Sequence, residues 1–238
     1  MAQLQRIAIA PSQIQANLIT LTQEQQHYLT RVLRLRPGDR FIAMDGQGKW
    51  WLSQLQIEQA EILEPLTVET ELSLGINLIV ALPKNGFDDI VRYSTELGVT
   101  CITPVLSDRT LLNPSPQKLE RWRRIATEAA EQSERAFVPT ILAPVAFNTA
   151  ITASTATHRY ICEARGHYPH FHSVVKSDSR EIVIATGPEG GWTEAEIENA
   201  IASGFQPVSL GRRILRAVTA PVVALTLISA ISENIVGE

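Results

Sequence analysis

The stretch that decides the fold runs from Ile182 to Ile228 and reads IVIATGPEGGWTEAEIENAIASGFQPVSLGRRILRAVTAPVVALTLI. It alternates short apolar, β-branched runs with turns and amphipathic segments, in the order strand, turn, helix, strand, turn, helix. Because this alternation is typical of a parallel sheet covered by helices, the stretch predicts an α/β domain. Each turn follows a strand, so we expect both at the carboxyl edge of the sheet, where open α/β sheets bind ligands.

The first turn is Gly187–Gly191, GPEGG. Its glycines let the backbone approach a ligand closely, but the turn is neither GxGxxG nor a P-loop. Glu189 places a carboxylate in it, which disfavours a pyrophosphate and favours a neutral or cationic nucleoside. A tight turn that needs glycine for its geometry alone is the alternative, and it would be preferred for GPEGG by itself. The second turn, Leu210–Arg216 (LGRRILR), shifts the balance toward a ligand site.

Together the two turns resemble those of the ribosomal RNA small-subunit (uracil-N3)-methyltransferases, a branch of the SPOUT superfamily. Ala185–Gly191 and Ser209–Ala220 carry this resemblance, and further matches follow in order along nearly the whole chain. These matches are His27, Val32–Arg34, Gly38-Asp39, Asp45-Gly46, Leu82–Lys84, Thr95–Gly98, Arg109, Arg121-Trp122, Ile125, Glu128–Ser133, Arg135 and Pro139. The resemblance implies a trefoil knot formed by the last loops and the C-terminal helix. Pattern alone would predict an unknotted sheet, because knots are very rare.

The resemblance further implies S-adenosylmethionine as cosubstrate, without a metal, and uracil N3 of 16S ribosomal RNA as the methylated atom. Arg216 and Glu189 are then the candidate catalytic residues. Arg216 would stabilise the imide anion left when N3 loses its proton, and Glu189 would assist that loss or only bind the cosubstrate. The implied cosubstrate-binding residues are Leu82, Ala185, Thr186, Gly187, Pro188, Glu189, Gly190, Gly191, Leu210, Gly211, Arg213, Ile214, Leu215 and Thr219.

Two positions depart from the family pattern. The final motif of the family often reads Arg-x-Glu-Thr-Ala, whereas Val218 stands at the acidic position here, and Tyr93 stands where a lysine is common. Three hypotheses therefore remain open: a uracil-N3 methyltransferase, a SPOUT methyltransferase acting on ribose 2′-OH or transfer RNA, and a non-catalytic RNA-binding assembly factor.

The charge distribution bears on RNA binding. A net charge of −4 over 238 residues argues against a generally basic nucleic-acid binder, so an RNA-binding surface would have to be local. The basic run that begins at Arg31 is a candidate, although an ordinary solvated face would be the preferred explanation of this run by itself. The implied RNA-binding residues are Arg31, Arg34, Arg36, Lys84, Arg109 and Arg135.

A change of composition near Glu71–Gly75 predicts two domains, 1–73 and 74–238. In the first, strands, one helix and an Asp-Gly hairpin turn predict a small barrel, which by resemblance is PUA-like and binds RNA. The predicted segments are a strand at 6–10, a helix at Leu21–Leu33, a hairpin at 41–55 and strands at Ile57–Leu63 and Leu66–Leu72.

In the second domain the pattern predicts strands that alternate with helices, which is the SPOUT α/β domain of the resemblance. The predicted strands are Asn77–Leu82, Cys101–Leu106, Arg159–Cys162, Ile182–Thr186 and Val208–Leu210. The predicted helices are Phe87–Leu97, one capped by Ser115, one from Thr193 to near Gly204, and Ala220 to about Ile231.

The remaining features favour a cytoplasmic protein. No apolar run reaches the ~18–20 residues that span a bilayer, and the N-terminus lacks a signal-peptide pattern. Cys101 and Cys162 are predicted to be free thiols, and the histidines of 167–172 fit no zinc spacing and predict a surface loop. The resemblance implies a homodimer, with which the long apolar C-terminal helix agrees, although burial in the monomer would also explain that helix.

Overall fold

The computed structural model describes residues 4–110, 114–176 and 179–233. The chain divides into two compact units. One consists of the residues up to Glu71 together with Ala130–Val138, and the other of Leu72–Ala129 and the residues from Pro139 onward. The first unit is therefore built from two separate pieces of the sequence, and the boundary at residues 73 and 74 stays a prediction.

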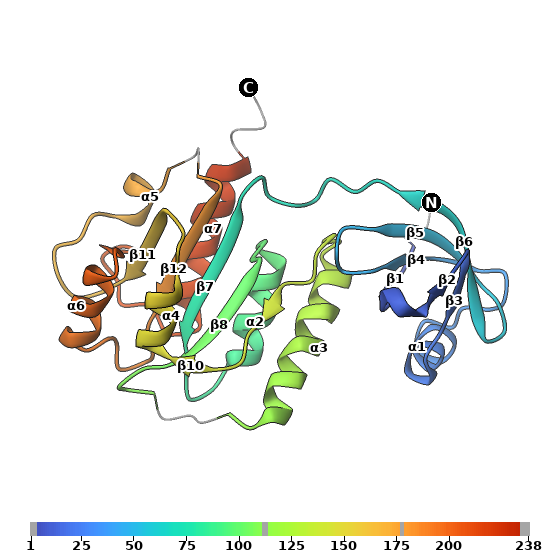
Figure 1. Cartoon of the computed structure of the whole chain (residues 1–238), viewed down its shortest axis with the longest axis horizontal. Helices are drawn as coiled ribbons and strands as arrows, with labels where there is room; N and C mark the ends of the chain where they lie inside the picture. Colours follow the sequence, from blue (N-terminus) through green and yellow to red (C-terminus); the bar gives the residue numbers. More distant parts are fainter. Residues whose placement is uncertain (1–3, 111–113, 177–178, 234–238) are drawn as a thin grey trace. The chain divides into compact units, whose positions relative to one another are not determined.

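The first unit contains a six-stranded sheet in the order β1-β4-β5-β6-β3-β2 (Figure 1). β1 pairs in parallel with β4, and the other neighbours pair antiparallel. One face of the sheet covers a core that includes Ile19, Leu29 and Phe41, all fully buried. The elements are β1 (Arg6–Ala8), η1 (Pro11–Gln13), β2 (Ile14–Gln15), β3 (Leu18–Thr20), β4 (Arg40–Met44), β5 (Trp50–Leu55) and β6 (Gln59–Leu66).

Local chemistry explains the hairpin and the helix of this unit. The predicted hairpin is confirmed as β4 and β5, and the Asp45 carboxylate accepts backbone N–H groups of Gln47 and Lys49 across the turn. The predicted helix is shorter: Thr22 and Gln25 form a capping box for α1 (Gln23–His27). A π-helical turn, η2 (Tyr28–Val32), then ends the helix. The prediction of a strand at Leu66–Leu72 is wrong, because β6 ends at Leu66, the first residue of that range.

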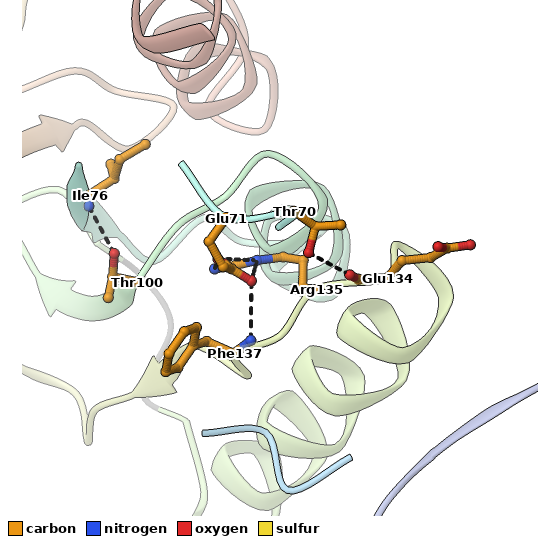
Figure 2. Close-up of polar contacts among 7 residues, drawn as sticks. All are labelled: Thr70, Glu71, Ile76, Thr100, Glu134, Arg135 and Phe137. Atoms are coloured by element: carbon orange, nitrogen blue, oxygen red, sulfur yellow. Dashed lines mark hydrogen bonds and ion pairs between the residues drawn. The ribbon is translucent and has the colours of Figure 1, made fainter. Parts of the chain in front are cut away.

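A buried ion pair holds the second piece of this unit in place. Nη2 of Arg135 lies 2.6 Å from Oε2 of Glu71, and the backbone N–H of Phe137 donates to the same carboxylate at 3.1 Å (Figure 2). The Thr70 hydroxyl donates to the carbonyl of Glu134. Arg135 is 4% exposed. Its predicted role toward RNA is therefore disfavoured, because a guanidinium buried against a carboxylate offers little surface to a phosphate.

The second unit contains a seven-stranded sheet in the order β10-β8-β7-β12-β11-β13, with β9 also on β8 (Figure 1). All its pairings are parallel, which confirms the predicted α/β class. The strands are β7 (Gly75–Ala81), β8 (Cys101–Leu106), β9 (Thr140–Ile141), β10 (Val145–Ala146), β11 (His158–Cys162), β12 (Glu181–Thr186) and β13 (Gln206–Val208). The helices are α2 (Phe87–Glu96), α3 (Pro116–Gln132), α4 (Phe147–Ala153), α5 (Phe171–Val174), α6 (Glu194–Ala202) and α7 (Thr219–Glu233).

Helices bury both faces of this sheet. Ile79, Ala81, Val183 and Ala185 join a core cluster with residues of α4 and α6. The alternate residues of β7 and β12 point the other way and are also buried. α7 contacts β12 and α2 on that second face. The continuous apolar strand sequences follow from this double burial. None of the described helices combines the length and apolar character that a membrane span requires.

The strand order creates a switch point beside β7. The chain passes from β7 to β8 on one side, whereas β12 and β11 lie on the other. The loops after β7 and β12 therefore start next to each other at the carboxyl edge and lead in different directions, which leaves room for a ligand between them.

Candidate active site

A cavity of about 380 Å³ opens at the carboxyl edge of the second unit's sheet. Its walls come from the loops after β11, β12 and β13 and from Arg109 after β8. A volume of this size is typical of small-molecule sites. The residues that line it are Arg109, Cys162–Arg165, Tyr168, Gly187–Glu189, Gly191–Glu194, Ile197, Leu210, Gly211, Arg213–Leu215, Ala217 and Ala220.

Hydrogen bonds from the neighbouring loops fix the GPEGG turn. Nη1 of Arg109 donates to the carbonyl oxygens of Gly190 at 2.6 Å and Trp192 at 3.2 Å. On the other side, the backbone N–H of Lys84 donates to Oε1 of Glu189 at 2.9 Å. The loops after three neighbouring strands, β8, β7 and β12, are thus joined at the edge of the cavity.

Trp192 anchors the same turn in the core. Its ring stacks on Phe147 with centroids 4.3 Å apart, and its Nε1–H donates to the carbonyl of Cys162 at 3.2 Å. A Cβ atom on Gly187 would lie 3.2 Å from this ring. Close packing against this ring therefore favours glycine at position 187.

A capping box starts the helix that follows the turn. The Thr193 hydroxyl accepts from the backbone N–H of Glu196, and the Glu196 carboxylate accepts from the backbone N–H of Thr193, as the sequence predicts. Glu196 also accepts the backbone N–H of Asp108 at 2.9 Å, so its buried carboxylate is satisfied from two loops.

The second predicted turn forms the other wall. Gly211 has a φ of +118°, a conformation that favours glycine, and Ile214 is 72% exposed while it lines the cavity. Arg216 is exposed just before α7. The methyl groups of Val218 face Gly86 of the loop after β7, where a Cβ atom would come within 2.8 Å of one of them.

The structure brings together most of the predicted cosubstrate-binding residues, because nine of them line the cavity. Leu82, Ala185 and Thr186 are fully buried and lie outside its lining. Gly190 and Thr219 are also absent from it, although Gly190 contacts Arg109. The nine are Gly187, Pro188, Glu189, Gly191, Leu210, Gly211, Arg213, Ile214 and Leu215.

One wall of the cavity, the loop after β11, was not predicted from the sequence. Glu163, Arg165 and Tyr168 line it, and the backbone N–H of Arg165 donates to the Glu163 carboxylate. The available signal was that a predicted strand, Arg159–Cys162, ends just before this loop. No group of three side chains that could hold a metal ion occurs in the described parts of the chain, which include the histidines that follow this loop.

The chemistry of the cysteines follows from their surroundings. Burial, and then the charge of Glu163, raise the pKa of the Cys162 thiol beside the cavity. Burial also raises the pKa of Cys101, which a hydrogen bond with Thr103 partly offsets. Both are free thiols, as predicted, and their protonated state makes them poor nucleophiles.

Of the predicted RNA-binding residues, Arg31, Arg34 and Arg36 are exposed in the first unit, and Lys84 and Arg109 are exposed in the second. Arg34 has a φ of +59°, an uncommon conformation for a residue with a side chain. Their roles toward RNA stay predictions.

Comparison with known proteins identifies the family. A family model described as the RNA methyltransferase domain matches residues 70–229, and one described as the RNA methyltransferase PUA domain matches residues 21–63. Ribosomal RNA small subunit methyltransferase E of Synechocystis is 50% identical over 237 residues, which cover 96% of this chain and 78% of that protein. The chain belongs to the ribosomal RNA small subunit methyltransferase E family. The Bacillus subtilis member is 30% identical and is matched over 98% of both chains.

A solved structure agrees with this membership. The Neisseria gonorrhoeae methyltransferase E, determined bound to S-adenosyl methionine, matches with a TM-score of 0.89 and 32% identity over 96% of this chain and 98% of that one. The likeness covers both units, which confirms the fold class of a PUA-like N-terminal domain followed by a parallel α/β domain of the methyltransferase E family.

Proposed function

We propose that this protein transfers the methyl group of S-adenosylmethionine to N3 of a uridine in 16S ribosomal RNA. One observation carries the proposal: residues of both predicted turns, Gly187–Gly191 and Leu210–Leu215, line one cavity in a member of the methyltransferase E family. The Neisseria gonorrhoeae relative was solved with S-adenosyl methionine, which supports the same cosubstrate here.

The residues of the cavity suit this cosubstrate. Leu215, Ile197 and Trp192 offer apolar surface for an adenine ring, and the close glycine backbone offers polar groups for its edges. Glu163, Glu189 and Glu194 supply negative charge toward a ligand that carries a sulfonium and an ammonium group. Arg109, Arg165 and Arg213 also line the cavity, so both signs of charge are present for a ligand that carries a carboxylate as well as its two cationic groups.

The sulfonium of S-adenosylmethionine supplies an activated methyl group, so the protein has to align the base and handle one proton. Arg216 is an exposed cation beside the second wall, and we assign it to the developing negative charge on the uracil oxygens. Val218 cannot accept a proton. Oε1 of Glu189 accepts a hydrogen bond from the loop after β7, so we assign Glu189 to positioning that loop. We assign the removal of the N3 proton to a water molecule.

This assignment of Glu189 predicts different results for two substitutions. Glu189→Gln keeps an oxygen that can accept from the Lys84 N–H, so S-adenosylmethionine affinity and kcat should stay within about threefold of the unchanged protein. Glu189→Ala removes the acceptor and should weaken the affinity about tenfold. Isothermal titration gives the affinity and labelled-methyl transfer gives kcat. A large loss of kcat in Glu189→Gln at unchanged affinity would instead make Glu189 the proton acceptor.

Nucleoside analysis tests the proposed reaction. The protein would be incubated with methyl-labelled S-adenosylmethionine and small ribosomal subunits from a strain that lacks this gene, followed by mass spectrometry of the nucleosides. We expect labelled 3-methyluridine. A different labelled nucleoside would overturn the assigned atom and favour another RNA target. Cosubstrate binding without any label would overturn catalysis and favour the RNA-binding assembly factor.

Further elements of the proposal concern assembly and location. We propose that residues 1–73 bind RNA, that the knot of the SPOUT superfamily is present in residues 74–238, and that the enzyme works in the cytoplasm as a homodimer. Val222, Val223, Leu227 and Ile231 of α7 are only partly buried within the chain, which supports a partner surface there. Light scattering of the purified protein should give twice the mass of one chain.

A further inference from the structure

Arg109 is a predicted RNA-binding residue, but in the structure its hydrogen bonds are with the protein. It is exposed in the loop after β8 and forms part of the cavity wall. Its guanidinium donates to two carbonyl oxygens of the turn after β12, those of Gly190 and Trp192. A Cβ atom on Gly190 would lie 3.0 Å from Cδ of Arg109, so the alkyl part of the side chain also packs on this turn.

We propose that Arg109 is a positioning residue that holds the Gly187–Trp192 turn in the shape that binds S-adenosylmethionine. The inference rests on the proposed function and deepens it by naming a residue that orders the cosubstrate-binding turn. Arg109 acts through the turn: its charge satisfies the carbonyl oxygens of Gly190 and Trp192, while the neighbouring residues Gly187–Glu189 and Gly191 line the cavity.

The composition of the turn explains why it needs stabilising contacts from outside. Three of its first five residues are glycines, which lose the most conformational freedom when they are fixed. Such a turn samples many conformations unless contacts from outside restrict it. A turn that is ordered before the ligand arrives binds more tightly, because less entropy is lost on binding.

The segment that carries Arg109 is itself held rigidly. The backbone N–H of Asp108 donates to Glu196, and the Thr193 hydroxyl donates to the Asp108 carboxylate at 3.0 Å. Two consecutive residues after β8 therefore contact both the turn and the start of α6. Because Glu196 is buried, its hydrogen bond with the Asp108 N–H is partly sheltered from solvent, which fixes the backbone next to Arg109.

The test compares cosubstrate binding with RNA binding, each measured separately. Arg109→Ala should weaken S-adenosylmethionine affinity about tenfold by isothermal titration without RNA, the effect of losing charge-assisted hydrogen bonds. Arg109→Lys should restore part of the affinity, because one ammonium can still donate to a carbonyl. Amide hydrogen exchange in Gly187–Trp192 should become faster in Arg109→Ala. The matched control is Arg124→Ala, an exposed arginine of α3 paired with Glu128.

RNA affinity of the same variants, measured without cosubstrate at several salt concentrations, should be unchanged. A phosphate contact would instead reduce the slope of log affinity against log salt by about 1. That result, or S-adenosylmethionine affinity in Arg109→Ala within twofold of the unchanged protein, would overturn the inference. If the unchanged protein itself failed to bind S-adenosylmethionine, the proposed function would fail first, so the two failures are distinguishable.

Discussion

Arg216→Ala is expected to lower kcat for methyl transfer by about 10²–10³ while the affinity for S-adenosylmethionine stays within about twofold. The reason is that Arg216 would act only when negative charge develops on the uracil oxygens, and losing one such donor typically costs this much. Labelled-methyl transfer to small subunits under saturating cosubstrate measures kcat, and titration measures the affinity. The absence of Arg216 from the cavity lining agrees with a contact to the base and not to the cosubstrate.

Arg212→Ala is the matched control for this experiment. Arg212 lies in the same turn, is exposed, and does not line the cavity, so its loss should leave kcat nearly unchanged. Arg216→Lys should recover part of the rate, because it keeps the charge but loses the planar arrangement of donors. An unchanged kcat in Arg216→Ala would remove the cation from the mechanism, and an equal loss in Arg212→Ala would point to the general charge of the turn.

Arg135→Ala is expected to destabilise the first unit by about 2–4 kcal/mol, because it leaves Glu71 without its buried partner. The pair is less sheltered on the Glu71 side, whose side chain is 23% exposed, so we expect a loss near the lower end. Denaturant unfolding followed by tryptophan fluorescence measures it. The RNA affinity of the folded variant should be unchanged, whereas the loss of a phosphate-binding arginine would weaken RNA binding.

Two further variants make the Arg135 test decisive. Glu71→Gln keeps acceptors for the Phe137 N–H but loses the charge, so it should be destabilised less than Glu71→Ala. The Glu71→Ala, Arg135→Ala double variant should lose less than the sum of the two single losses, since each single change already breaks the pair. Strict additivity would show that the two side chains do not stabilise each other.

The sequence predicted the elements whose signals are local. The strand at Cys101–Leu106 has the predicted bounds, and the Thr193 capping box forms as its spacing requires. Both glycine-bearing turns meet in one cavity, because the carboxyl ends of parallel strands share an edge. The first two features are determined by residues a few positions apart, and the third follows from the general geometry of parallel sheets.

What could not be predicted depends on which strands become neighbours. The loop after β11 lines the cavity because β11 pairs with both β12 and β13, an order that no spacing reveals. The same holds for Arg109 and Arg135, because the sequence does not show the partners of an arginine. In the structure Arg109 donates to two backbone carbonyls, and Arg135 pairs with a carboxylate that is distant in sequence. Val218 lies against Gly86 for the same reason, far from it in sequence.

The two-piece construction of the first unit has a consequence for biosynthesis. Arg6 forms an ion pair with Glu134, the backbone N–H of Ala8 donates to Glu131, and Glu71 pairs with Arg135. A nascent chain emerges N-terminus first, so its six-stranded sheet can form before these partners have been synthesised. The first unit therefore completes its folding only after residue 138 has left the ribosome. An isolated fragment that ends at residue 73 would expose these unpaired groups permanently and is a poor choice for expression.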